Sequence, residues 1–276
     1  MFEIGKAGGT ALKKILFIIW SYSLGGGAES LLTMIVNHLN PQKYDISIIE
    51  CCHFDVKSEP VNQNITVLEP ITYDKDPEYK KKMYYIFNNP DIIREMFIHD
   101  NYDLYISFNY QTPSFLLPNY AKCISWVHTD IYDLSEEPKR KIRDAQGQAF
   151  EKADKIVAIS DNTQKSILDL YPQYTNKIIK IYNGIDITSI RKKNHEIETE
   201  ILAPSIIFVG RLEDRKNPMR LLEVFRKVHE RNSSVHLYYI GKGTCAAQIE
   251  KSADRYQLSE YVHLLGYIQN PYPIIK

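Results

Sequence analysis

The stretch Lys-Ile-Leu-Phe-Ile-Ile-Trp at residues 14–20 decides the fold class of this chain. A continuous apolar run of that length is typical of a strand covered on both faces, as in the parallel sheets of α/β proteins. The glycine-rich loop 21–27 follows it, and apolar residues then recur at helical spacing over residues 28–40. The sequence therefore predicts a strand, a loop and a helix, the first unit of a doubly wound sheet.

The same alternation of apolar runs and helical stretches continues along the chain. Further strands are predicted at residues 44–50, 65–68, 102–108, 121–128, 155–160, 177–182, 205–210, 235–241 and 262–266. Helices are predicted at residues 72–100, 136–153, 161–170, 218–230 and 246–257, with Asp161 as a cap. This pattern predicts an α/β fold with mostly parallel sheets, which bind ligands at the carboxyl ends of their strands.

The chain divides into segments that differ in apolar content and in periodicity. Residues 1–12 lack periodicity and are predicted to be a disordered lead-in, and residues 13–186 form the first Rossmann-like domain. Residues 187–203 contain little apolar sequence, which indicates a linker. Residues 204–276 restart the pattern but hold only three strands. Because three strands and their helices bury little surface, we expect the second domain to be incomplete.

Composition excludes several classes of protein. The 276 residues are 44% hydrophobic and 25% charged, which is ordinary for a globular protein. Lys and Arg number 34, as do Asp and Glu, so no global basic field favours nucleic acid. The first apolar run is too short for a signal peptide, which predicts a cytoplasmic protein. The four cysteines show no C-x-x-C spacing, so we expect buried thiols and no metal site.

Three glycines, Gly25, Gly26 and Gly27, join the first strand to the first helix. Glycines let a ligand approach the backbone, and a helix start offers free amides suited to phosphate. A tight turn that merely needs glycine is the alternative. No Gly-Lys-Ser/Thr follows, so the loop is not a Walker loop, and its spacing is not G-x-G-x-x-G either.

Cations follow the first strand of the second half. Arg211 and Lys216 lie in one strand-to-helix connection, where fixed positive charges suit a diphosphate, although such a loop can also be solvated surface. Earlier in the chain, His128 ends a predicted strand, where it could bond a sugar hydroxyl or transfer a proton, or simply pack.

Two other motifs are set aside. Residues 241–246 match G-x-G-x-x-A without the acidic partner that NAD binding needs, and residues 74–76 (D-x-D) lie in a polar stretch typical of a solvated loop.

Taken in order, these pieces resemble the family 4 glycosyltransferases, retaining enzymes of the GT-B fold. The matching residues are 25–29, His128, 157–160, 183–186, 208–212 with Lys216, 239–243 and 262–266. The likeness spans roughly residues 14–269. It implies two Rossmann-like domains that face a cleft, with a UDP- or GDP-sugar bound by the second.

The resemblance also implies roles for individual residues. Arg211 and Lys216 would hold the donor diphosphate without a metal or other cofactor, where they oppose the charge that develops on the leaving group. On the donor side it also places Gly26, Gly27, Gly241 and Gly243, with His128 as the catalytic candidate beside the donor sugar. On the acceptor side it places Gly25, Asn109 and Tyr110.

Partners follow from the same resemblance. The acceptor is expected to be a saccharide or a lipid-linked sugar in bacterial cell-surface polysaccharide synthesis, which implies peripheral contact with the inner face of the membrane. The 20 tyrosines and the lysine run at residues 80–82 are compatible with that contact.

One element of the family pattern is missing from this sequence. Family members carry a Glu followed, after seven residues, by a second Glu, and no Glu here has another eight positions on. We therefore expect a C-terminally truncated transferase with impaired turnover. The alternative is a non-catalytic GT-B partner that steers an active transferase; the missing pair favours it and the retained cations oppose it. A GT-B epimerase or phosphorylase fits the 210–216 loop less well.

Overall fold

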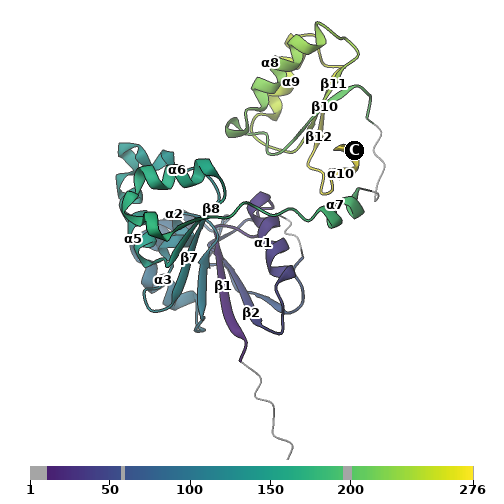
Figure 1. Cartoon of the computed structure of the whole chain (residues 1–276). Coiled ribbons are helices and arrows are strands. Elements are labelled where there is room, and N and C mark those ends of the chain that lie inside the picture. The colour runs from purple at the N-terminus through teal and green to yellow at the C-terminus, as the bar shows by residue number, and fades with distance from the viewer. Residues whose placement is uncertain (1–10, 57–59, 195–200, 276) are drawn as a thin grey trace, which may run out of the picture. The chain divides into compact units, whose positions relative to one another are not determined.

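The chain divides into two units of unequal size, Met1–Gly184 and Ile185–Lys276. The computed structural model describes residues 11–56, 60–194 and 201–275 (Figure 1). The predicted lead-in lies almost wholly outside these described residues, as does part of the predicted linker. Each unit is an α/β structure with its own parallel sheet.

Unit 1 is built on a seven-stranded parallel sheet in the order β4-β2-β1-β6-β7-β8-β9. Its strands are β1 (Lys13–Ile19), β2 (Tyr44–Glu50), β4 (Ile65–Val67), β6 (Leu104–Ser107), β7 (Lys122–Val127), β8 (Lys155–Ala158) and β9 (Ile178–Lys180). A separate two-stranded sheet pairs β3 (Cys52–His53) with β5 (Thr72–Tyr73). Each strand of the large sheet lies at an apolar run from which a strand was predicted.

Strand β1 is covered on both faces, as its sequence predicted. Leu16 and Ile18 pack into one apolar cluster, and Phe17 and Ile19 into another, because successive side chains of a strand point to opposite faces. All four side chains are at most 1% exposed. Burial of each contributes roughly 1.5–3 kcal/mol, so this strand anchors both layers of the unit.

Helices cover the two faces of this sheet. They are α1 (Gly27–His38), α2 (Tyr79–Asn88), α3 (Pro90–Phe97), α4 (Thr112–Phe115), α5 (Arg140–Lys152) and α6 (Asp161–Leu170), with short 3-10 turns η1 (Tyr132–Ser135), η2 (Glu137–Lys139) and η3 (Pro172–Lys177). The single helix predicted over residues 72–100 is two helices. Pro90 separates them because proline starts a helix readily but cannot continue one.

The cap of α6 differs from the prediction. The side chain of Ser160, not that of Asp161, accepts the amide of Thr163, at 3.1 Å. Ser160 has the extended backbone that an N-cap requires, whereas Asp161 is already helical.

The four cysteines are buried free thiols, as predicted.

Unit 2 has a three-stranded parallel sheet made of β10 (Ser205–Val209), β11 (His236–Ile240) and β12 (Val262–Gly266). The helices α8 (Pro218–His229) and α9 (Ala246–Arg255) pack on one face, where Leu237 and Tyr239 are fully buried. A 3-10 turn, η4 (Asp214–Lys216), precedes α8. These elements lie where the sequence predicted strands and helices.

The predicted linker contains a helix, α7 (Ile187–Lys193). Asp186 caps it by accepting the amide of Ser189 at 2.9 Å, and Asn270 donates to the carbonyl of Lys193 at 2.7 Å. This bond ties α7 to the segment that leads into α10 (Tyr272–Ile275). Residues 187–193 are therefore a folded part of unit 2. Within the described residues, no helix has the length and apolar character needed to cross a bilayer.

Candidate functional site

The strand order of unit 1 reverses at β1. The chain adds β2 and β4 on one side of β1 and later β6 to β9 on the other, so the switch point lies between β1 and β6. Ligands bind α/β sheets outside the carboxyl ends of the strands at such a point. The backbone amide of Trp20, after β1, donates to Oδ1 of Asn109, after β6, at 3.0 Å. The structure thus brings together two segments that were predicted to contact ligand.

The three glycines of the turn after β1 lie in different surroundings. Gly25 has a φ of 70°, a left-handed conformation that favours glycine. A Cβ at Gly26 would lie 2.6 Å from Oε2 of Glu29, which is in the first turn of α1. A Cβ at Gly27 would meet nothing within 4 Å. The backbone conformation therefore accounts for Gly25, whereas a shift of the flexible Glu29 side chain would make room for a Cβ at Gly26 and open space remains at Gly27.

Glu50, at the end of β2, is a site residue that sequence reasoning missed. Its carboxylate is 4% exposed, and its Oε2 accepts the amides of Tyr22 at 2.7 Å and Ser23 at 2.9 Å. Its Oε1 lies 2.6 Å from Nδ1 of His53. The one sequence signal was an acidic residue at the end of an apolar strand, next to the strand that leads into the glycine turn.

His128 follows β7, the strand beside β6. Its ring lies against Phe108, with 4.3 Å between centroids, and is stacked with Trp126. Burial lowers its pKa to about 4, so the imidazole is neutral at neutral pH. Its Nε2 is buried and has no hydrogen-bond partner in the described part of the chain. A buried polar atom of this kind is costly when unpaired, and a ligand hydroxyl could satisfy it.

The predicted acceptor-side residues have partners within unit 1. Oδ1 of Asn109 accepts a hydrogen bond from the amide of Trp20, and the hydroxyl of Tyr110 lies 3.4 Å from Oδ1 of Asp133. Asp133 also pairs with Lys139 at 3.2 Å. These bonds fix the loop after β6 at the carboxyl edge of the sheet, and contact with an acceptor stays a prediction.

In unit 2, the loops after β10 and β11 meet backbone to backbone. A Cβ at Gly241 would lie 1.9 Å from the carbonyl oxygen of Gly210, and one at Gly243 would lie 2.3 Å from that of Leu212. The amide of Leu212 donates to the carbonyl of Lys242 at 2.9 Å. Gly241 and Gly243 are therefore required by the packing of the two loops, and their role in donor binding stays a prediction.

A hollow of about 320 Å³ opens at this edge of the unit 2 sheet. It is lined by Leu212, Gly241, Lys242, Gly243, Ala246, Glu250, Leu264 and Gly266. Arg211 and Lys216 do not line it; both are exposed on the adjoining loop. Nη1 of Arg211 lies 3.5 Å from Oε1 of Glu213, a surface pair worth about 1 kcal/mol or less, so an anionic ligand could displace the carboxylate.

Two other features do not form a candidate site. Asp76 of the D-x-D stretch is paired with Lys82, which lowers the pKa of its carboxyl, so this carboxylate already has a cationic partner. Within the described residues, no cluster of three His, Cys, Asp or Glu side chains could hold a metal ion.

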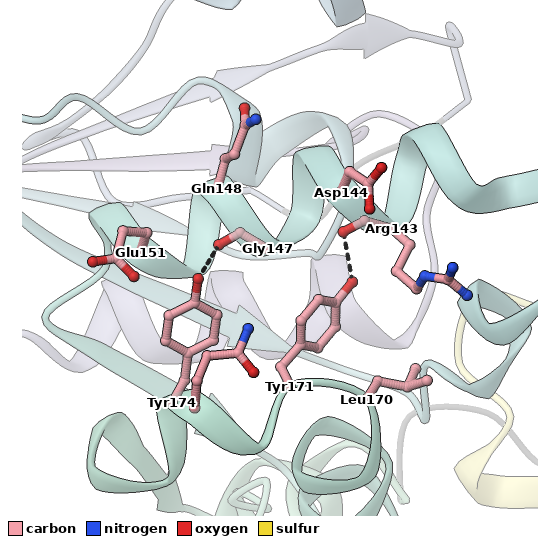
Figure 2. A pocket seen from close by; sticks show the side chains of 9 residues that line it. Arg143, Asp144, Gly147, Gln148, Glu151, Leu170, Tyr171 and Tyr174 are labelled. Atoms are coloured by element: carbon pink, nitrogen blue, oxygen red, sulfur yellow. Dashed lines mark hydrogen bonds between the residues drawn. The ribbon is translucent and has the colours of Figure 1, made fainter.

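A larger hollow of about 430 Å³ lies between α5 and the α6–η3 segment (Figure 2). The hydroxyls of Tyr171 and Tyr174 donate there to the carbonyls of Arg143 and Gly147, both at 2.9 Å. A Cβ at Gly147 would lie 3.4 Å from the ring of Tyr171, so the glycine lets this ring pack on α5. The tyrosine hydroxyls are thus satisfied by backbone, and none of the predicted site residues lines this hollow.

Two α/β units, each with polar or glycine-rich loops at the carboxyl edge of a parallel sheet, agree with the GT-B architecture that the sequence resemblance implies. Two protein-family models match the sequence. The model of Glycosyltransferase Family 4 matches residues 25–189, and that of Glycosyl transferases group 1 matches residues 186–275. The chain belongs to glycosyltransferase family 4.

Individual relatives share parts of this chain. An uncharacterized glycosyltransferase of Methanocaldococcus jannaschii is 25% identical over 170 residues, which cover 59% of this chain and 42% of that protein. The N-acetylgalactosamine-N,N'-diacetylbacillosaminyl-diphospho-undecaprenol 4-alpha-N-acetylgalactosaminyltransferase of Campylobacter jejuni is 27% identical over 123 residues, 45% of this chain and 33% of that one. The matches thus span less than half the length of these curated relatives.

A solved structure shares the fold over most of the chain. HepE of Anabaena, in complex with UDP and glucose, superposes with a TM-score of 0.64 at 16% identity, covering 95% of this chain and 71% of that one.

Proposed function

We propose that this chain carries the sugar-transfer site of a retaining glycosyltransferase that uses a UDP-linked donor. The observation that carries the proposal is the loop after β10, where Arg211 and Lys216 are exposed beside the hollow at the carboxyl edge of the unit 2 sheet. A guanidinium and an ammonium suit the oxygens of a diphosphate. The UDP and glucose bound to HepE favour UDP over GDP in the donor.

We propose the following course for the reaction. The bond between the sugar C1 and the diphosphate oxygen breaks, the acceptor oxygen bonds C1 on the same face, and the acceptor proton passes to the leaving diphosphate. Arg211 and Lys216 stabilise the charge that develops on that diphosphate, without a metal. His128 is neutral, so it contributes a hydrogen bond to a donor-sugar hydroxyl rather than a positive charge.

The acceptor is proposed to be a saccharide or a lipid-linked sugar in cell-surface polysaccharide synthesis. The name of the Campylobacter relative describes transfer to a diphospho-undecaprenol-linked sugar, which supports a lipid-linked acceptor. Such an acceptor would bring the protein to the inner face of the membrane from the cytoplasm.

Helices α2 and α3 offer a surface for that contact (Figure 1). Tyr84, Tyr85, Ile92 and Met96 are all exposed, Tyr84 by 71%, and α2 carries the lysine run 80–82. Aromatic and apolar side chains beside lysines suit the interface of an anionic bilayer. Co-sedimentation of the protein with anionic but not zwitterionic vesicles is the expected result, and equal recovery with both would contradict this contact.

The donor site is tested by binding. Titration of the whole chain with UDP should show affinity that falls at least about tenfold in Arg211→Ala or Lys216→Ala, because each loses a charged contact to phosphate. Lys227→Ala, an exposed lysine on α8, is the matched control and should bind as the wild type does. Equal affinity in all variants would contradict the donor site, and co-purification with a transferase without UDP affinity would favour the non-catalytic partner.

Turnover is tested separately. Transfer from UDP-glucose, UDP-N-acetylglucosamine, UDP-N-acetylgalactosamine and GDP-mannose to polyprenyl-diphosphate sugars can be followed by mass spectrometry, and the anomeric configuration by NMR. We propose weak turnover, because no Glu in the sequence is followed by another eight positions on. A robust rate would overturn the proposed impairment, and an inverted product would overturn retention.

A further inference from the structure

We propose that Glu50 is the positioning residue of the glycine turn, so that one buried carboxylate sets where Gly25, Gly26 and Gly27 lie. The inference rests on the proposed function for its kinetic consequence, because the resemblance to family 4 glycosyltransferases implies that Gly26 and Gly27 act on the donor side. Its structural consequence is independent of activity.

The carboxylate holds the turn through several bonds at once. Its Oε2 accepts the amide of Tyr22 at 2.7 Å, the amide of Ser23 at 2.9 Å and the hydroxyl of Ser23 at 2.8 Å. These two residues immediately precede the segment 24–27 that opens α1. Charged hydrogen bonds to backbone amides are stronger than neutral ones, so they fix the path of the chain as it enters the turn.

The same carboxylate ties the turn to the loop after β2. Oε1 of Glu50 lies 2.6 Å from Nδ1 of His53, and Oγ of Ser23 in turn accepts the amide of Phe54 at 2.8 Å. The ring of His53 packs edge-on against Tyr73, with 5.4 Å between centroids. The loops after β1 and β2 are therefore joined through Glu50 and Ser23.

Packing alone does not explain a carboxylate at this position. Glu50, Tyr22 and Ser23 are each at most 5% exposed, and burial of a charged group is unfavourable unless donors surround it. In the register of the sheet, Glu50 lies opposite Ile19, the last residue of β1, and this apolar neighbour offers the carboxylate no side-chain donor. The donors that face Glu50 come instead from the two loops, which indicates that the role of Glu50 is to hold these loops in place.

Four variants separate positioning from general stability. Glu50→Ala removes every bond, and Glu50→Gln keeps a carbonyl oxygen that can accept the amides of Tyr22 and Ser23. Ser23→Ala removes only the hydroxyl bonds, for the case in which Glu50→Ala fails to fold. Asp103→Asn is the control, because Asp103 accepts the amide of Lys14 at 2.8 Å at the opposite end of β1.

The first measurement is hydrogen exchange of the peptide over residues 20–27 in the whole chain. Glu50→Ala, or Ser23→Ala to a lesser extent, should exchange at least about tenfold faster there than the wild type, with Glu50→Gln close to the wild type and Asp103→Asn unchanged. Unchanged exchange in both Glu50→Ala and Ser23→Ala overturns the proposal, as does faster exchange of equal size in Asp103→Asn.

The second measurement is the kinetics of transfer. Glu50→Ala should raise the KM for the nucleotide sugar about tenfold with kcat within about threefold, and Glu50→Gln should restore most of the loss. A KM equal to the wild type in a variant whose turn exchanges faster overturns the role in donor binding. A wild-type chain that neither binds UDP nor transfers sugar contradicts the proposed function alone, and hydrogen exchange then decides the inference about Glu50.

Discussion

Replacement of His128 by Phe should make unit 1 less sensitive to acid. The imidazole packs against the rings of Phe108 and Trp126, its buried Nε2 has no hydrogen-bond partner among the described residues, and burial is what lowers its pKa to about 4. Phenylalanine keeps an aromatic ring at the site but cannot take up a proton. The difference in the free energy of unfolding between the two proteins should therefore change with pH.

The magnitude follows from the displaced pKa of His128. Its ordinary value is 6.5, so as the pH falls the unfolded chain takes up the proton before the folded chain does. The stability contributed by the neutral ring is thus present above about pH 6.5 and is lost as the pH falls toward 4. Between pH 7.5 and pH 5 the wild type should lose about 2 kcal/mol that His128→Phe does not lose.

Urea unfolding followed by tryptophan fluorescence measures this difference. The chain has two tryptophans, Trp20 and Trp126, and both belong to unit 1, so the signal reports that unit. Exposed His99→Phe controls for the loss of one imidazole. If the difference in the free energy of unfolding between the wild type and His128→Phe stays constant from pH 7.5 to pH 5, the burial argument is refuted.

Three smaller changes probe other features. Gly241→Ala should destabilise unit 2 by about 3 kcal/mol or more, seen in thermal unfolding by circular dichroism, because its Cβ would overlap the backbone of Gly210; a shift of under 1 °C would contradict this packing. Gly27→Ala should leave stability unchanged or raise it by up to about 1 kcal/mol, since its Cβ meets nothing within 4 Å, and a clear loss in the same assay would show otherwise. Ser160→Ala should cost about 1 kcal/mol in urea unfolding through the lost cap of α6, and an unchanged free energy of unfolding would contradict that cap.

Apolar runs made the sheets predictable. A strand such as β1, buried on both faces, needs an uninterrupted apolar sequence, and where such runs alternate with helices they seldom form anything but strands. The order of the strands then places Asn109 and His128 at the same edge as the glycine turn. This much of the candidate site follows from local sequence and from the rule that ligands bind at the carboxyl ends of strands.

Contacts that join distant segments were not predictable from the sequence. Glu50 bonds residues that lie 27 and 28 positions earlier, and nothing in its own strand indicates which donors it meets. Helix α7 was missed because its sequence is polar, and its stability comes from the Asp186 cap and the bond from Asn270. The sequence did not indicate that a neighbouring loop occupies the space of the missing side chains at Gly241 and Gly243.

The contact between the loops at residues 210–212 and 241–243 constrains how this chain can be engineered. With backbone against backbone, neither loop can accept a different length or a larger residue at the junction unless the other changes with it. A chimaera that imports one of these loops from a relative should therefore misfold locally, whereas one that imports both should fold. In this chain the two loops are therefore expected to be exchangeable only as a pair.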